Sequence, residues 1–159
     1  MTKSLSETII SQVREVNKKT SISVKPDLIY VSKDIQEFRR NIRRFRNLIR
    51  QEFSLKEIAA LSGLISTPNY GDMWVMFFNG GFFGINTEVY TNHFIRYVYL
   101  HELGHLRHYA HTKYLDDEHN ADVFAIKNLK KHWPKFESQT QFITGLRELN
   151  TLAYNTKEI

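Results

Sequence analysis

The sequence contains no cysteine, so it can form neither a disulfide framework nor a metal site built on thiolates. It has no internal repeat and no low-complexity stretch. No apolar run is as long or as pure as a membrane span, and residues 1–20 have no apolar core of a signal peptide. These absences predict a cytoplasmic protein that has no contact with a membrane.

The composition is that of a folded chain, because 42% of the 159 residues are hydrophobic and 13% are aromatic. The length is that of one domain with a substantial core. Ser4 and Glu7 have the spacing of a capping box, and apolar residues follow at helical period to about Lys19. Residues 22–31 are rich in Val, Ile and Tyr and predict one or two short strands, interrupted at Pro26.

An arginine-rich helix is expected to begin after Ser32 as its cap. Its apolar face comprises Phe38, Ile42, Phe45 and Ile49, and its other faces carry Arg39, Arg40, Arg43, Arg44, Arg46 and Arg50. Six arginines in twelve residues could bind nucleic-acid phosphate or an acidic partner. A solvated helix exterior is the favoured interpretation, because no aromatic or glycine-rich recognition element accompanies the arginines.

Two further segments precede the centre of the chain. Residues 54–63 begin with a capping box and predict a short helix that ends at Gly63. Residues 72–78 and 82–86 are rich in β-formers, and the small residues 79–81 between them predict the turn of a β-hairpin.

The central feature is His101-Glu102-Leu103-Gly104-His105, an H-E-x-x-H motif on a predicted helix. Residues four apart share one helical face, so both imidazoles can reach the same metal ion. Glu102 lies about 100° further round the helix, close enough to take a proton from metal-bound water without being a ligand. A chance match is common enough that the motif alone proves nothing.

A second motif, Glu118-x-x-Ala121-Asp122, begins thirteen residues after His105. A catalytic zinc takes three protein ligands and leaves its fourth position to water, so two histidines need a partner from another element. Glu118 and Asp122 share a helical face; Glu118 can bind the metal while Asp122 accepts the other ring N–H of a histidine. The small residues Gly104, Ala121 and Ala125 would let the two helices approach closely. The alternative for the two acids is a solvated acidic face.

In combination these motifs resemble the ImmA/IrrE-type metallopeptidase family, whose members are small gluzincin-like zinc proteins of bacteria and their mobile elements. The resemblance is carried by Gly84-Ile85-Asn86, by residues 94–105 and by residues 118–125, and it covers roughly residues 72–130.

The resemblance implies His101, His105 and Glu118 as the ligands of one Zn²⁺ per chain and Glu102 as the general base. It also implies a protein substrate, with a helix-turn-helix transcriptional repressor as a candidate.

Peptide hydrolysis is the reaction that these residues would carry out. Zinc would lower the pKa of its water toward ~7, and Glu102 would take the proton as the water attacks a carbonyl carbon. Glu102 would then deliver the proton to the leaving amine. We also expect an oxyanion stabiliser besides the metal, for which His108, Tyr109 and Tyr114 are unranked candidates.

His111 is an alternative third ligand, because its spacing from His105 matches that of the third histidine of metzincins. His108, however, stands where those proteins have a glycine that lets the chain turn. Two alternatives to a peptidase also remain open. One is a metal-bound module that binds a partner without cutting it, and the other is a nucleic-acid-binding protein that uses the Arg39–Arg50 helix.

The patterns predict a single α+β domain of small zincin-like type, with a short sheet and a hairpin edge packed on helices around a central H-E-x-x-H helix. Residues 1–71 would form a supporting region of helices and strands, residues 72–133 the metal-binding core, and residues 134–159 a C-terminal helix with Phe142, Leu146 and Leu149 facing inward. An extended substrate could add to the hairpin edge through main-chain hydrogen bonds.

Overall fold

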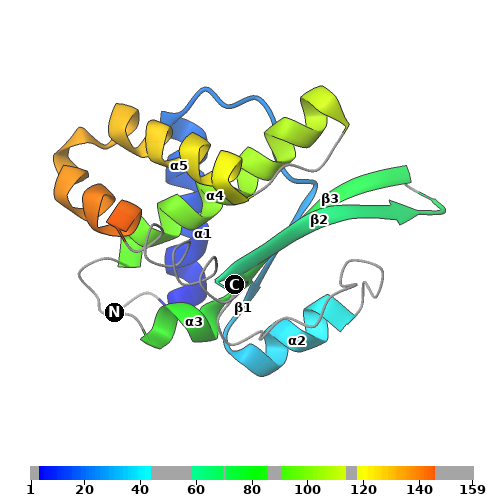
Figure 1. Cartoon of the computed structure of the whole chain (residues 1–159). Coiled ribbons are helices and arrows are strands. Elements are labelled where there is room, and N and C mark those ends of the chain that lie inside the picture. The colour runs from blue at the N-terminus through cyan, green and yellow to red at the C-terminus, as the bar shows by residue number, and fades with distance from the viewer. Residues whose placement is uncertain (1–3, 44–58, 70, 86–90, 114–117, 146–159) are drawn as a thin grey trace, which may run out of the picture.

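The computed structural model describes residues 4–43, 59–69, 71–85, 91–113 and 118–145 (Figure 1). The helices are α1 (Leu5–Lys19), α2 (Ile35–Arg43), α3 (Gly80–Ile85), α4 (Thr91–Thr112) and α5 (Glu118–His132), and the strands are β1 (Leu28–Ser32), β2 (Ala60–Thr67) and β3 (Gly71–Asn79). A 3₁₀ turn, Pro134–Phe136, follows α5, and residues 137–145 are helical. The predicted α+β class is confirmed. None of the helices in these ranges is long and apolar enough to cross a membrane.

The sheet is organised around β3, which lies between β1 and β2. β3 runs parallel to β1 and antiparallel to β2, with which it forms a hairpin. Helix α2 covers one face of the sheet, and α1 and α4 lie on the other, with α5 packed on α4 (Figure 1). Because side chains alternate between the two faces of a strand, β3 contributes to both cores.

The two cores differ in size. On the α2 side, Val75 and Phe77 pack with Phe38 and Ile42 of the helix. On the other side, Trp74, Met76 and Phe78 join the larger cluster formed by α1, α4 and α5. The H-E-x-x-H helix α4 belongs to this larger cluster. It is therefore held on two sides, by the sheet and by two helices.

Helix α1 has the bounds that its capping box and apolar period predict. The Glu7 amide donates to Ser4 Oγ at 3.2 Å, and Glu7 Oε2 accepts from the Ser4 amide at 3.1 Å. The helix ends at Lys19, and its buried side chains are Ile9, Val13 and Val16. In the region 22–31 there is a single strand, β1, which begins after Asp27; the segment before it belongs to no helix or strand.

The prediction that Ser32 caps the arginine-rich helix is wrong. The cap is Asp34, whose Oδ1 accepts a hydrogen bond from the Glu37 amide at 2.8 Å. Ser32 ends β1, and its hydroxyl accepts a hydrogen bond from Asn41 Nδ2 at 3.0 Å. Phe38 and Ile42 are buried as predicted, whereas Arg39, Arg40 and Arg43 are exposed. Residues 44–50, which carry the other three arginines, lie outside the described residues.

The strand predicted at residues 72–78 is confirmed as β3, but the predictions on either side of it are wrong. Residues 54–58, where the short helix was expected to begin, lie outside the described residues. Residues 60–67 form strand β2 rather than the end of a helix, because they pair along their whole length with β3. The hairpin turn precedes Gly71, whose φ of 71° favours glycine. Gly80 begins α3 instead of turning a hairpin. A Cβ at Gly80 would lie 2.1 Å from the Ser32 carbonyl oxygen, so the close packing of α3 on β1 requires glycine there.

In the C-terminal part, the predicted break of the chain at Trp133-Pro134 is confirmed, but the prediction that Phe142 faces inward is wrong. Helix α5 ends at His132, just before Trp133-Pro134. In the helical segment that follows, Ile143 is buried, and Phe142, which was expected to face inward, is 49% exposed. Leu146 and Leu149 lie outside the described residues.

Candidate metal centre

Close contact between α4 and α5 positions the site. Gly104 immediately precedes the second histidine of the motif, and a Cβ there would lie 3.1 Å from the Ala121 Cα atom of α5. The same added carbon would lie 3.1 Å from the ring of Phe124. The absence of a side chain at Gly104 therefore lets α5 approach the backbone of α4. This approach brings Glu118, the first residue of α5, to the histidine face of α4.

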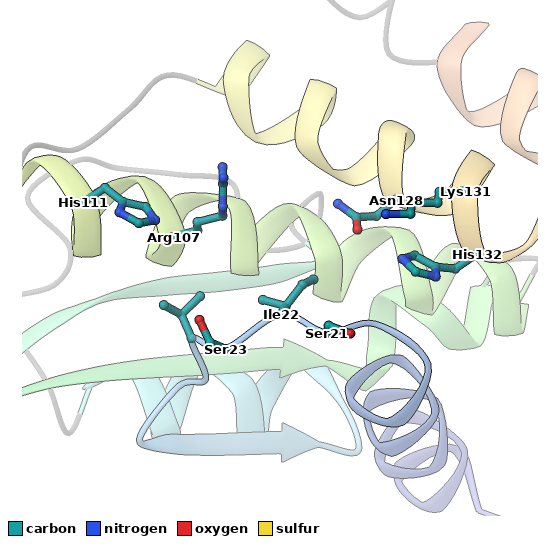
Figure 2. A pocket seen from close by; sticks show the side chains of 9 residues that line it. Ser21, Ile22, Ser23, Arg107, His111, Asn128, Lys131 and His132 are labelled. Carbon is teal, nitrogen blue, oxygen red and sulfur yellow. The ribbon is translucent and has the colours of Figure 1, made fainter.

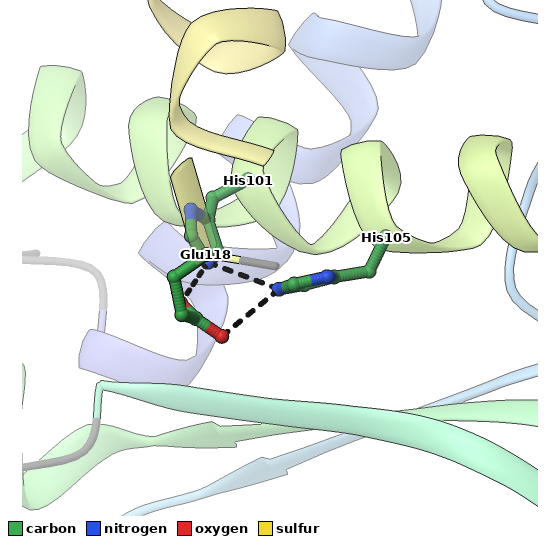
Figure 3. Close-up of side chains that lie close together, drawn as sticks. All are labelled: His101, His105 and Glu118. Atoms are coloured by element: carbon green, nitrogen blue, oxygen red, sulfur yellow. Dashed lines mark hydrogen bonds and ion pairs between the residues drawn. The ribbon is translucent and has the colours of Figure 1, made fainter. Parts of the chain in front are cut away.

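The structure brings together the three side chains that the sequence proposes as ligands (Figure 3). His101 Nε2 lies 2.8 Å from Glu118 Oε2, and His105 Nε2 lies 3.2 Å from Glu118 Oε1. The two Nε2 atoms are 3.2 Å apart. His101 is buried, whereas 69% of the Glu118 side chain is exposed. The cluster is thus walled on the α4 side and open on the Glu118 side.

Asp122 supports this cluster from one helical turn further along α5. Its Oδ1 accepts a hydrogen bond from His101 Nδ1 at 2.7 Å and another from the hydroxyl of Tyr97. A carboxylate can only accept, so the shared proton belongs to Nδ1 of the imidazole. The Nε2 atom of a neutral His101 then directs its lone pair toward His105 and Glu118. This is the arrangement that a metal-ligating histidine usually has.

The charges of the cluster indicate that it favours a cation. Burial alone would lower the pKa of His101, but hydrogen bonds to Asp122 and Glu118, together with the charge of Glu102, raise it to about 10. Hydrogen bonds from His101 and His105 hold the pKa of Glu118 well below its usual range. The side chains around His101 Nε2 therefore stabilise positive charge at that point, which either a proton or a metal ion can provide.

The distances also fit a metal ion. Three donors at zinc–nitrogen and zinc–oxygen bond lengths in a tetrahedral site are separated by about 3.4 Å. The two imidazole Nε2 atoms are 3.2 Å apart, and each lies 2.8 to 3.2 Å from a different oxygen of the Glu118 carboxylate. One ligand atom from each of the three residues lies within 4.8 Å of the other two, which is close enough for all three to contact one ion. These three residues can hold a metal ion.

Glu102 lies beside the cluster and is itself buried. Burial raises its pKa, while the charges of His101 and His105 act in the opposite direction. The hydroxyl of Ser62, from strand β2, donates a hydrogen bond to Glu102 Oε2. The edge strand of the sheet is thus in direct contact with the acidic residue of the motif. A buried carboxylate of raised pKa is well suited to accept and release a proton.

The other candidates lie elsewhere. Helix α4 continues straight through His108 to Thr112, so His111 points away from the cluster and lines a separate pocket. Tyr109 packs its ring on Trp74 of the sheet, with centroids 5.6 Å apart. His108 is half-buried on α4, and Tyr114 is outside the described residues. Among the described residues, the potential metal-binding group contains only His101, His105 and Glu118.

Two functional contacts were not predicted from the sequence. Tyr97 precedes His101 by four residues, so helical spacing could have placed its hydroxyl near the second-helix acid. Ser62 had no such signal, because its contact with Glu102 spans forty residues and depends on sheet pairing.

Comparison with known proteins adds no assignment. No family model matches the sequence, and no curated protein and no solved structure matches the chain.

Proposed function

We propose that this protein is a zinc-dependent peptidase of zincin type, in which His101, His105 and Glu118 hold the metal and Glu102 is the general base. The observation that carries the proposal is the convergence of two imidazoles and one carboxylate at 2.8 to 3.2 Å beside a buried glutamate. Two imidazoles and one carboxylate around an open position are the ligand set of several catalytic zinc sites.

When bound, zinc would supply a Lewis acid and a water molecule of lowered pKa. Side chains of the protein would transfer the protons and position the base. Glu102 is not among the converging donors, so its carboxylate is available to take a proton from the attacking water. It delivers this proton to the amine that leaves when the peptide bond breaks. The Ser62 hydroxyl positions the Glu102 carboxylate through its hydrogen bond.

Strand β2 suggests how a peptide would lie in the site. β2 is at one end of the sheet order, so its outer edge pairs with no strand of the described residues. An extended segment could add to this edge through main-chain hydrogen bonds and pass the metal centre at Ser62. This supports a protein substrate presented in extended form. The resemblance to ImmA/IrrE proteins makes a helix-turn-helix repressor the first class to test.

The proposal has two separable tests. Metal analysis after dialysis without chelator should give about one zinc per chain, because one site offers three ligands. A protein that neither retains zinc nor binds added zinc would overturn the proposal.

The second test replaces the proposed base. Glu102→Gln should retain zinc but lose peptide hydrolysis, with a decrease of at least about 100-fold. Glu137→Gln, an exposed change of the same kind outside the site, is the matched control and should cleave as the parent does. The parent and both variants are incubated with a helix-turn-helix repressor encoded next to the gene for this protein, and fragments are identified by mass spectrometry. If the parent binds this repressor but cleaves nothing, the non-cleaving module replaces the peptidase.

A further inference from the structure

A second concave site lies beside α4 and is lined by none of the three candidate ligands (Figure 2). It is a pocket of about 400 Å³ between α4, α5 and the segment 21–24 that follows α1. Arg107 follows His105 by two residues and is therefore about 200° away round the helix. The pocket and the metal centre thus use different faces of α4, and neither shares a lining residue with the other.

The side chains that α4 and α5 contribute to this pocket are mostly basic. They are Arg107 and His111 from α4, and Asn128, Lys131 and His132 from α5. No carboxylate is among the described residues that line it. Partial burial lowers the pKa of His132, and the positive charges of Lys131 and Lys19 lower it further. The neighbouring cations therefore repel one another, and a bound anion would relieve this repulsion.

A simpler explanation is that basic residues in the last turn of a helix offset its dipole. Lys130, Lys131 and His132 occupy the last turn of α5, and His111 that of α4. The dipole explains a basic residue at each helix end, but it does not explain why cations from two helices line one concavity. Lys130 serves as a comparison, because it is in the same turn of α5 but does not line the pocket.

The arrangement of the basic side chains indicates the shape of the ligand. In Figure 2, Arg107 and His111 lie at one end of the pocket and Lys131 and His132 at the other, with the segment Ser21–Ser23 below. An elongated anion would contact both ends, whereas a single phosphate would contact one. The volume is near the lower end of the range for small-molecule sites, which is about 300–1,000 Å³. The guanidinium of Arg107 already lies over the Phe124 ring, 5.4 Å from its centroid, which restricts its motion.

We propose that this pocket binds a small molecule with a di- or triphosphate group, held at one end by Arg107 and at the other by Lys131. The phosphates could come from a nucleotide or from free inorganic polyphosphate. The proposal is independent of the peptidase activity, since it concerns other residues and requires no bond to be cleaved.

Calorimetric titration of the zinc-loaded protein tests it, with tripolyphosphate, ADP and inorganic phosphate as the three probes. Tripolyphosphate should bind at one site per chain and more tightly than inorganic phosphate. Arg107→Gln and Lys131→Gln should each weaken it by about 10-fold, as expected for the loss of one charged contact. Lys130→Gln, the matched change in charge, should alter affinity by less than about 2-fold. Tighter binding of ADP than of tripolyphosphate would assign the phosphates to a nucleotide, and the reverse order to free polyphosphate.

Three outcomes would overturn the proposal. One is the absence of binding by any probe at millimolar concentration. Another is an equal loss of affinity in Lys130→Gln and Lys131→Gln, which would mean diffuse attraction by surface charge. The third is loss of binding in Glu118→Ala, which would mean that the phosphates coordinate the metal. The changed side chains are exposed, so these variants are expected to fold, and circular dichroism checks this for each protein.

Discussion

Replacing Asp122 by alanine should weaken the proposed zinc binding, although Asp122 is not one of the three candidate ligands. Its carboxylate accepts a hydrogen bond from His101 Nδ1 at 2.7 Å and a second from the Tyr97 hydroxyl. Without this acceptor nothing fixes the proton on Nδ1, and the tautomer with the proton on Nε2 cannot bind the metal through that atom. The loss of such a partner typically costs 10- to 100-fold in affinity, or about 1.4 to 2.7 kcal/mol.

Three further variants should bind zinc either more weakly or more tightly than Asp122→Ala does. Glu118→Ala should be more damaging, because two histidines alone would then hold the ion. Tyr97→Phe should cost only a few-fold, since it removes one hydrogen bond to Asp122 but leaves the carboxylate charge in place. His111→Ala should leave zinc affinity within about 2-fold of the parent, because it lines the other pocket.

Competition with a chromophoric chelator measures the dissociation constants of the parent and the four variants, and circular dichroism verifies that each protein is folded. The reasoning requires the order parent, Tyr97→Phe, Asp122→Ala, Glu118→Ala, from tightest to weakest. An Asp122→Ala affinity within 2-fold of the parent would refute the role given to its hydrogen bond. Retained affinity in Glu118→Ala together with a loss in His111→Ala would refute the assignment of the third ligand.

Other contacts yield further predictions. Gly80→Ala should lower the free energy of unfolding, measured in urea, by about 1–3 kcal/mol, because its Cβ would lie 2.1 Å from a backbone oxygen of β1. Gly145→Ala is the control: its Cβ would have no atom within 4 Å, so it should not lower the free energy of unfolding. Burial and, to a smaller extent, the charge of Arg96 lower the pKa of His93 to about 4. The contribution of neutral His93 to stability is therefore complete above pH ~6.5 and is lost as the pH falls toward 4. Relative to His93→Gln, the parent should lose about 2 kcal/mol between pH 7 and 4.5; parallel pH curves would contradict this. Ser62→Ala removes a hydrogen bond that lowers the pKa of Glu102, so the acid limb of the pH–kcat/KM profile should move to higher pH. At pH 6 the value of kcat/KM should fall several-fold, and Ser62→Thr should restore it. An acid limb that does not move would contradict the positioning role of Ser62.

The metal centre could be predicted from the sequence because most of its geometry is local. Helical periodicity alone places His101 and His105 on one face, and the same spacing places Glu118 above Asp122. Small residues at Gly104 and Ala121 indicated that the two helices approach closely, and they do. Helix α1 is predictable for the same reason, since both partners of its capping box lie within one turn.

The sheet, in contrast, was decided by tertiary structure. Residues 60–67 lack a strong local preference, and they are a strand because β3 offers a pairing partner along their whole length. The alternation of Trp74, Val75 and Met76 between two cores depends on helices on opposite faces, which no local pattern specifies. The same pairing places Ser62 beside Glu102, forty residues away in the chain. Periodicity fixes neighbours within a few turns of one helix, whereas contacts between distant segments depend on which surfaces the folded chain can bury together.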